Sequence, residues 1–246
     1  MTTDFDIVIC VGPNDNSIVN SSVECAKKNI IGYRNIYLVC SNPTINIDGA
    51  ITIDEKFFPF KITDIQDIFG NNDRNGWYLQ QLLKFYSGII IPDILQKYLI
   101  IDCDTHFLKP TRFFTDDGKQ MLTTGTEYNI PYFDHMNRLH PSLKKVHPLS
   151  GISHHTFFDT ECILQLFKLV EEYHNNINPF WKIYLDVIDK TQYLSSAAAE
   201  NETYFTYMYL YHSEKICIRQ LYWENVHSLD INSPCDFVSV HWWMRN

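Results

Sequence analysis

Apolar residues recur along this chain in two patterns, short continuous runs and longer helical repeats. Continuous runs rich in β-branched residues occupy positions 6–12, 35–40 and 97–102. The first two end in Gly-Pro-Asn and Ser-Asn-Pro, and the third ends in Asp102. Such runs are typical of strands buried on both faces of a parallel sheet. Shorter runs predict further strands at 51–53, 119–125, 217–219 and 236–241.

Helical periodicity occupies the segments between these runs. It predicts helices over residues 17–30, with Ser17 as the N-cap, and over 75–87, 160–174 and 200–211. In the second helix one face is apolar and predicted to meet the core: Tyr78, Leu79, Leu82, Leu83 and Tyr86. A second face carries Arg74, Trp77, Gln81 and Lys84, which suits solvent and a binding site equally well.

Strands that alternate with helices imply βαβ units, so residues 1–246 are predicted to form a single α/β domain. An apolar fraction of 45% and a charged fraction of 20% fit a globular protein with a real core. The formal net charge of −9, with no basic run, argues against nucleic acid as the main partner. A polyphosphate ligand stays compatible with this charge if a divalent cation mediates the contact.

The cysteines and the start of the chain bear on location. The chain has 7 cysteines, an odd number, and none of them form a C-x-x-C pair. Most lie in apolar runs, which favours reduced thiols and a cytoplasmic site of action, in the host cell if the source is a virus. The first residues do not resemble a signal peptide, and no apolar run is long enough to span a bilayer.

The strongest chemical signal is the pair Asp102 and Asp104, which follows the buried run Tyr-Leu-Ile-Ile. Ligands of open α/β sheets gather beyond the carboxyl ends of the strands. Two carboxylates two residues apart on a turn can both bind one cation, and oxygen ligands suit Mn²⁺ or Mg²⁺. The pair therefore predicts a metal site for a diphosphate leaving group, with a plain polar turn as the alternative.

Further candidates lie later in the chain. His241 ends a predicted strand and is a candidate third metal ligand, or else a surface histidine. Glu200 and Glu202 begin a predicted helix, where they either satisfy the helix dipole or serve the acceptor hydroxyl as a base. His154 and His155 are adjacent, so on a strand at most one of them would face a ligand.

Together these segments resemble nucleotide-sugar glycosyltransferases of the GT-A fold, in particular glycogenin-like and galactosyltransferase-like retaining enzymes. The resemblance rests on the run Tyr98–Pro110, the later Ser-Gly-Ile, the Glu-Asn-Glu helix start and the final His241, in that order. A closer resemblance is to a GT-A-like group found in bacteria and large DNA viruses. It is carried by the segments Asn75–Lys84, Glu127–Met136, Ser150–His155 and Glu200–Tyr204.

The resemblance implies a GT-A-like, Rossmann-like mixed sheet flanked by helices, and transfer from a nucleoside-diphosphate sugar, UDP-sugar favoured, with retention. The acceptor would be a glycan, a protein or a small molecule. The metal would lie on Asp102, Asp104 and His241. The implied donor contacts are Val11, Gly12 and Asn14 at the base and ribose, Arg74 and Lys84 at the phosphates or sugar, and also Trp77, Asp102, Cys103, Ser150 and Gly151. The implied catalytic residues are Glu200, Glu202 and His154.

Two departures from the family pattern affect the stereochemistry. The retaining enzymes carry an Asp-Gln pair at the acidic helix start, where this chain has Glu-Asn-Glu. They often carry a lysine after the final histidine, where Arg245 is the nearest cation here.

Three other functions stay open from the sequence. A phosphatase-like hydrolase would use Asp102 as nucleophile and Asp104 as acid, but its pattern places a threonine one position after Thr105. A non-catalytic nucleotide-sugar-binding module would share the same residues. A zinc hydrolase would draw on five histidines whose spacing matches no H-E-x-x-H pattern: His135, His140, His147, His154 and His155.

Overall fold

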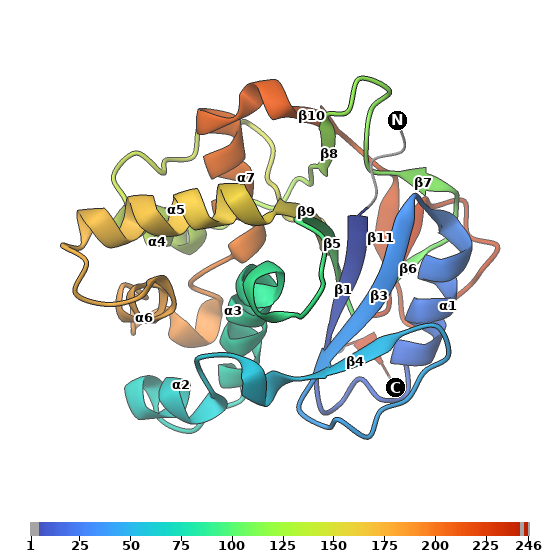
Figure 1. Cartoon of the computed structure of the whole chain (residues 1–246), viewed down its shortest axis with the longest axis horizontal. Helices are drawn as coiled ribbons and strands as arrows, with labels where there is room; N and C mark the ends of the chain where they lie inside the picture. Colours follow the sequence, from blue (N-terminus) through green and yellow to red (C-terminus); the bar gives the residue numbers. More distant parts are fainter. Residues whose placement is uncertain (1–4, 242–243, 246) are drawn as a thin grey trace.

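The buried runs pair into one mixed sheet at the centre of the molecule (Figure 1). The computed structural model describes residues 5–241 and 244–245. The sheet has the order β4-β3-β1-β5-β9, and β9 alone runs antiparallel, against β5. Its strands are β1 (Phe5–Val11), β3 (Tyr33–Cys40), β4 (Ile51–Asp54), β5 (Lys97–Asp102) and β9 (His155–Asp159). Every residue of β1 is buried, as the continuous apolar run predicts.

Helices cover both faces of this sheet. Figure 1 shows α1 on one side and α3, α5 and α7 on the other. The helices are α1 (Val19–Asn29), α2 (Ile62–Phe69), α3 (Asn75–Ile90), α4 (Ile130–Leu139), α5 (Thr160–Tyr173), α6 (Phe180–Asp186) and α7 (Glu200–Tyr211). Short 3₁₀ turns span Glu55–Phe57, Tyr193–Ser195 and Ser213–Lys215. The predicted α/β fold, a mixed sheet flanked by helices, is confirmed.

Three small sheets fasten the segments around the central one. They pair β8 (Gln120–Thr123) with β10 (Ile216–Arg219), and β2 (Ile30–Ile31) with β7 (Thr111–Arg112). The third joins β6 (Thr105–Phe107), β12 (Phe237–Ser239) and β11 (Trp223–Asn225). Because β12 lies antiparallel to β6, the end of the chain returns directly beside the segment that follows Asp102.

The sheet register brings three loops to one edge. Cys10 of β1 lies opposite Asp102 of β5, so both strands end together. His155, the first residue of β9, lies opposite Ile101, because β9 enters the sheet where β5 leaves it. The loops after β1, after β5 and before β9 therefore meet at the same place.

Helix α3 follows its predicted pattern on the apolar face, where all five predicted core residues are buried. Its second face is not a solvent face, since Gln81 is 1% exposed and Lys84 is 4% exposed. Arg74 and Trp77 are half-buried beside them.

One local prediction was wrong: Ser17 does not cap α1, because the N-cap is Ile18 and it makes no side-chain capping bond. Several elements have no counterpart among the predicted ones. They include α4, whose first turn holds a proline, and the buried strand β9, which pairs with a strand more than fifty residues earlier in the chain.

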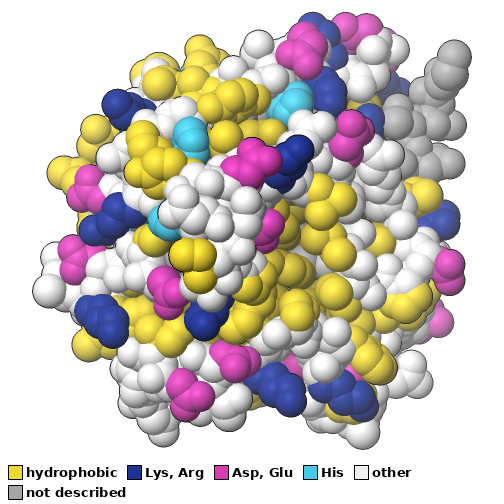
Figure 2. All heavy atoms as spheres, turned by 60° about the vertical axis from the view of Figure 1, so that its left-hand side comes forward, with side chains coloured by type: hydrophobic (Ala, Val, Ile, Leu, Met, Phe, Trp, Pro, Cys, Tyr) yellow, Lys and Arg dark blue, Asp and Glu magenta, His cyan; other side chains and the backbone are white. Residues whose placement is uncertain are grey.

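The surface agrees with the acidic, mixed composition. The helix-rich face in Figure 2 intersperses apolar side chains with acidic and basic ones. All seven cysteines are free thiols, as their number and spacing predict. None of the described helices combines the length and apolarity that a membrane crossing requires.

Candidate functional site

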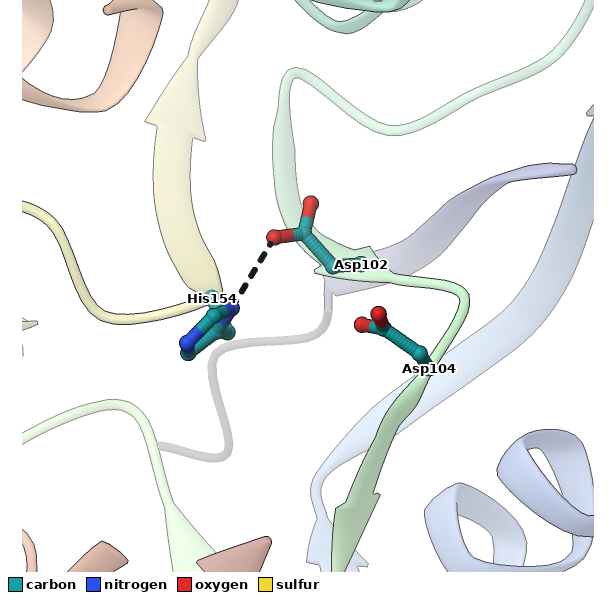
Figure 3. A group of neighbouring side chains, drawn as sticks. All are labelled: Asp102, Asp104 and His154. Atoms are coloured by element: carbon teal, nitrogen blue, oxygen red, sulfur yellow. Dashed lines mark ion pairs between the residues drawn. The ribbon is translucent and has the colours of Figure 1, made fainter. Parts of the chain in front are cut away.

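Asp102, Asp104 and His154 meet where β5 ends and β9 begins. One potential ligand atom from each residue lies within 4.8 Å of the others. Figure 3 shows the carboxylate of Asp104 directed toward the side on which Asp102 and His154 lie. Two carboxylate oxygens and one imidazole nitrogen suit a divalent cation such as Mn²⁺ or Mg²⁺. Two of these three residues belong to the metal set predicted from sequence.

Backbone structure fixes the position of His154. The amide of Asp102 donates a hydrogen bond of 2.9 Å to the carbonyl oxygen of His154. The φ angle of His154 is 59°, in the left-handed region that is uncommon outside glycine. This turn directs the ring of His154 toward Asp102, with 3.5 Å between Nδ1 and Oδ2. The next residue, His155, is buried and bonds to Thr123 Oγ1 at 2.9 Å, so the two histidines diverge as expected.

Lys84 links Asp102 to helix α7. Its Nζ lies 2.6 Å from Asp102 Oδ1 and 2.6 Å from Glu200 Oε1. Burial lowers the pKa of Lys84, but the two carboxylates more than offset this effect and keep the ammonium charged. Burial likewise raises the pKa of Asp102, and Lys84 and His154 more than reverse that shift. Asp102 is therefore a fixed anion at the edge of the sheet.

Asp104 is held by the end of the chain. Its Oδ1 accepts a hydrogen bond of 3.1 Å from Ser239 Oγ, and its Oδ2 lies 3.5 Å from Arg245 Nη2. Arg245 also pairs with Asp15 Oδ1 at 2.8 Å. Burial and the nearby charge of Asp102 raise the pKa of Asp104 to about 6. The crowding of two carboxylates is thus only partly relieved by the arginine.

The ion pairs around Asp102 and Asp104 leave a net negative charge that a divalent cation could neutralise. Lys84 serves Asp102 and Glu200, while Arg245 serves Asp104 and Asp15. Four carboxylates against two cations give this group of six residues a formal charge of −2. A bound Mn²⁺ or Mg²⁺ would neutralise it, which agrees with the donor chemistry of the site.

His241 lies next to this group. Its ring centroid is 5.9 Å from that of His154. Burial, together with the proximity of His154, lowers the pKa of His241 to about 4, so its ring is neutral near pH 7. The structure groups His154, which was expected to be catalytic, with the two aspartates. The ligand role of His241 stays a prediction.

Glu200 and Glu202 lie in the first turn of α7, as predicted, but they have different partners. Glu202 is fully buried and accepts hydrogen bonds from Ser150 Oγ at 2.8 Å and Gly151 N at 2.6 Å. Its other oxygen pairs with Lys145 at 2.9 Å. Both oxygens of Glu202 therefore hold the loop before β9, whereas Glu200 faces Lys84.

Gly151 is required for close packing in this loop. A Cβ atom there would lie 2.3 Å from Cβ of Phe205 on α7 and 3.0 Å from the carbonyl of Asn201. The glycine lets the loop backbone approach the helix, so Ser150 and Gly151 are placed by packing as well as by Glu202.

The other predicted donor contacts lie at the start of α3 and in the turns after β1 and β5. Arg74 lies over the ring of Trp77, 4.3 Å from its centroid, and donates to Ser196 Oγ. The remaining predicted residues belong to the turns after β1 and β5: Val11 and Cys103 are buried, Gly12 is half-buried and Asn14 is exposed. Gly12 N donates to Asp15 Oδ2 at 3.1 Å, which ties the first turn to Arg245.

Sequence reasoning missed three residues of the site. Asp15 and Ser239 carried no motif, and only their contacts with Arg245 and Asp104 bring them in. Trp223 packs its ring edge-to-face on His154, with the centroids 4.8 Å apart. The aromatic share of 15% was a weak signal for such a contact.

Comparisons with known proteins give little beyond this geometry. No protein-family model and no curated protein matches the sequence. Among solved structures, the chain is similar to mouse xyloside xylosyltransferase 1 in its apo form. The identity is 11% and the TM-score 0.47, over 91% of this chain and 88% of that one. A likeness this distant assigns neither a family nor an activity to the chain.

Proposed function

We propose that this chain is a metal-dependent glycosyltransferase that moves a sugar from a nucleoside-diphosphate sugar to an acceptor hydroxyl. The observation that carries the proposal is the grouping of Asp102, Asp104 and His154 at the carboxyl edge of the parallel strands. A UDP-sugar as donor and retention of configuration follow from the resemblance to GT-A enzymes. The formal charge of −2 around the aspartates supports a divalent cation in this place.

Mn²⁺ or Mg²⁺, held by Asp102, Asp104 and His154 with His241 beside them, would neutralise the charge of the leaving diphosphate. The turn of Val11, Gly12 and Asn14 lies at the adjacent strand end and would contact the base and ribose. Arg245 already bridges this turn to Asp104, so its guanidinium would meet the donor phosphates in this proposal.

The side of α3 serves the sugar in this proposal. Lys84 fixes the orientation of Asp102, and Glu200 fixes Lys84 from α7. Arg74 and Trp77 form a half-buried cation–aromatic pair on the same helix face, which suits a polar ring with hydroxyl groups. Glu202, expected to be catalytic, acts as a positioning residue through Ser150 and Gly151.

The first test is a thermal-shift panel of UDP-, GDP-, CMP- and dTDP-sugars, each with and without Mn²⁺. A ligand that binds the native state stabilises it by ~2.7 kcal/mol at a hundred times its Kd. We expect one nucleotide class to raise Tm only with metal, and Asp104→Asn to abolish that shift. Asp116→Asn is the matched control, because this carboxylate is 99% exposed.

Release of nucleoside diphosphate from the stabilising donor is the second measurement. Metal-dependent release supports the transferase. If a donor stabilises the protein but no nucleoside diphosphate is released with any acceptor tested, the chain is a binding module instead. Phosphate release from simple phosphate esters, with no response to any nucleotide sugar, would replace the transferase by a phosphatase-like hydrolase.

A further inference from the structure

An open groove of about 740 Å³ lies beside the candidate metal group. One wall is the segment after β8, and the other is the β10–β11 connection with β11. Its lining residues are Thr124, Gly125, Thr126, Gln220, Leu221, Tyr222, Trp223, Glu224 and Asn225. A space of this size suits a ligand of one or two sugar rings. None of these residues is a ligand of the candidate metal group.

Trp223 connects the groove to the metal group. Its ring lines the groove and also contacts the ring of His154 at 4.8 Å. A stack on Phe237, with centroids 5.5 Å apart and planes 10° apart, holds the indole in place. The opposite wall is fixed because Gly125 and Ser150 exchange backbone hydrogen bonds of 2.8 and 3.0 Å. A ligand in the groove would therefore lie against a rigid surface next to the metal.

The chemistry of the lining favours a neutral, hydroxyl-rich ligand. Tyr222 and Trp223 offer aromatic surface, while Gln220, Asn225 and Thr126 are exposed groups that both donate and accept hydrogen bonds. Such a combination of flat aromatic surface and neutral polar groups matches the alternating C–H faces and hydroxyl edges of a sugar ring.

The same lining disfavours an anionic ligand. Among the lining residues the only charged side chain is that of Glu224, which accepts a hydrogen bond of 2.7 Å from Tyr222 Oη. The nearby Arg219 does not supply a cation to the groove. Its guanidinium donates to the carbonyl of Arg112 and lies 4.7 Å from the ring centroid of Phe113. A phosphate or carboxylate would thus lose water without gaining an oppositely charged partner among the lining residues.

We propose that this groove binds the acceptor and that the acceptor is a neutral saccharide, so that the chain extends a glycan. The inference rests on the proposed transferase activity. In the transfer, a saccharide hydroxyl oxygen bonds to the anomeric carbon of the donor sugar. The bond from that carbon to the phosphate oxygen breaks, the diphosphate leaves with the electron pair, and the hydroxyl proton ends on it.

Saturation-transfer NMR tests the groove without donor or metal. The probes are the methyl glycosides of glucose, galactose and mannose, the disaccharides lactose and maltose, and glucose 6-phosphate as the anion. We expect a saturation-transfer signal on at least one neutral sugar with the wild type, and a weaker signal on glucose 6-phosphate. The signal on the neutral sugar should be strongly reduced with Tyr222→Ala and with Asn225→Ala. Tyr173→Ala is the control, because this tyrosine is exposed and lines a separate groove.

Three results would overturn the inference. They are no saturation-transfer signal on any neutral probe, signals in both groove variants equal to those in the wild type, and a stronger signal on glucose 6-phosphate than on the neutral sugars. The donor assay separates this failure from failure of the transferase proposal. If metal-dependent donor binding is intact but the groove binds no sugar, only the acceptor assignment is wrong. If the groove binds sugar but no donor binds, the groove stands as a saccharide site and the transferase proposal is wrong.

Activity gives the last arm of the test. The rate of glycosyl transfer from the donor to the sugar that binds should fall at least about tenfold in Tyr222→Ala. Metal-dependent hydrolysis of the donor to free sugar should be retained. An equal loss of hydrolysis and transfer would show that the groove acts on the donor, which contradicts the acceptor assignment.

Discussion

Lys84 shows at the scale of one residue how the site combines stability with function. Its ammonium is 4% exposed and bonds to two carboxylates from different elements, β5 and α7. The helical pattern predicted that Lys84 shares a face with Arg74, but it could not show which charges it meets. A buried ion triad of this kind contributes mainly by fixing geometry, because the desolvation cost offsets much of the attraction.

Removing the charge of Lys84 should destabilise the protein. Lys84→Met leaves Asp102 and Glu200 close together without a cation, at a cost of ~3 kcal/mol, the low end for buried pairs since Asp102 is partly exposed. Adding Glu200→Gln removes one of the two anions, so the double variant should lose less than the sum of the single losses. Urea unfolding of the cycle measures this coupling.

The matched control for that cycle is Lys168→Met with Glu172→Gln. This pair is 3.7 Å apart on the exposed surface of α5, so its coupling should stay below ~0.5 kcal/mol. Additive losses in the Lys84 and Glu200 cycle would contradict a shared charge network.

Arg245 provides a second test at the residue scale. Its guanidinium lies 3.5 Å from Asp104 and neutralises part of the negative charge that would otherwise attract a metal ion. Arg245→Gln should therefore raise the Mn²⁺ affinity measured without donor by about tenfold, because the competing positive charge is gone. Calorimetric titration measures this, with the exposed Arg112→Gln as control. Unchanged or weaker affinity would rule out competition between the arginine and the metal.

The two aspartates of the candidate metal group could be predicted from the sequence, but the presence of His154 beside them could not. Asp102 and Asp104 follow a buried strand, and that local pattern alone locates them at a strand end. His154 reaches them only because β9 enters the sheet antiparallel to β5, a pairing between distant segments. His241 ends a local strand pattern, so sequence favoured it over His154.

At the scale of elements, the loop before β9 packs closely against α7 near the site. Gly151 permits it, since a Cβ would lie 2.3 Å from Phe205. Gly151→Ala should cost ~1–3 kcal/mol through overpacking and should weaken metal binding by shifting His154. Gly76→Ala on α3 is the matched control, because its Cβ would meet nothing within 4 Å and alanine favours a helix. Thermal unfolding with and without Mn²⁺ distinguishes the two.

Element prediction succeeded where the signal is local and failed where packing decides. Strands β1, β3 and β5 were identified from continuous apolar runs, and α3, α5 and α7 from their periodicity. Helix α4 lies in a stretch with many polar residues, yet Tyr132, His135 and Met136 are buried in it. Its formation depends on the helices it packs against, which no single segment of sequence specifies.

At the scale of the whole molecule, several buried histidines are neutral. His135 of α4 is fully buried, and its Nε2 donates a hydrogen bond of 2.9 Å to the carbonyl of Tyr184 on α6. Burial lowers the pKa of His135 to about 4. The helical layer is thus joined by a group whose protonation is unfavourable in the folded state, so acid destabilises the fold through this histidine.

The sign of this effect follows from proton uptake. In the unfolded chain His135 takes up a proton near pH 6.5, but in the folded chain only near pH 4. Between these values the unfolded state binds more protons, so stability falls as pH decreases, by up to ~1.4 kcal/mol per pH unit for this residue.

His135→Gln keeps a donor for the Tyr184 carbonyl but cannot be charged. The difference in unfolding free energy between wild type and variant should therefore shrink steadily from pH 7 to pH 4 and then level off. The exposed His227→Gln should run parallel to the wild type over the same range. A constant difference for His135→Gln would mean that its burial does not control acid stability, and the measurement cancels every other titrating group because both proteins share them.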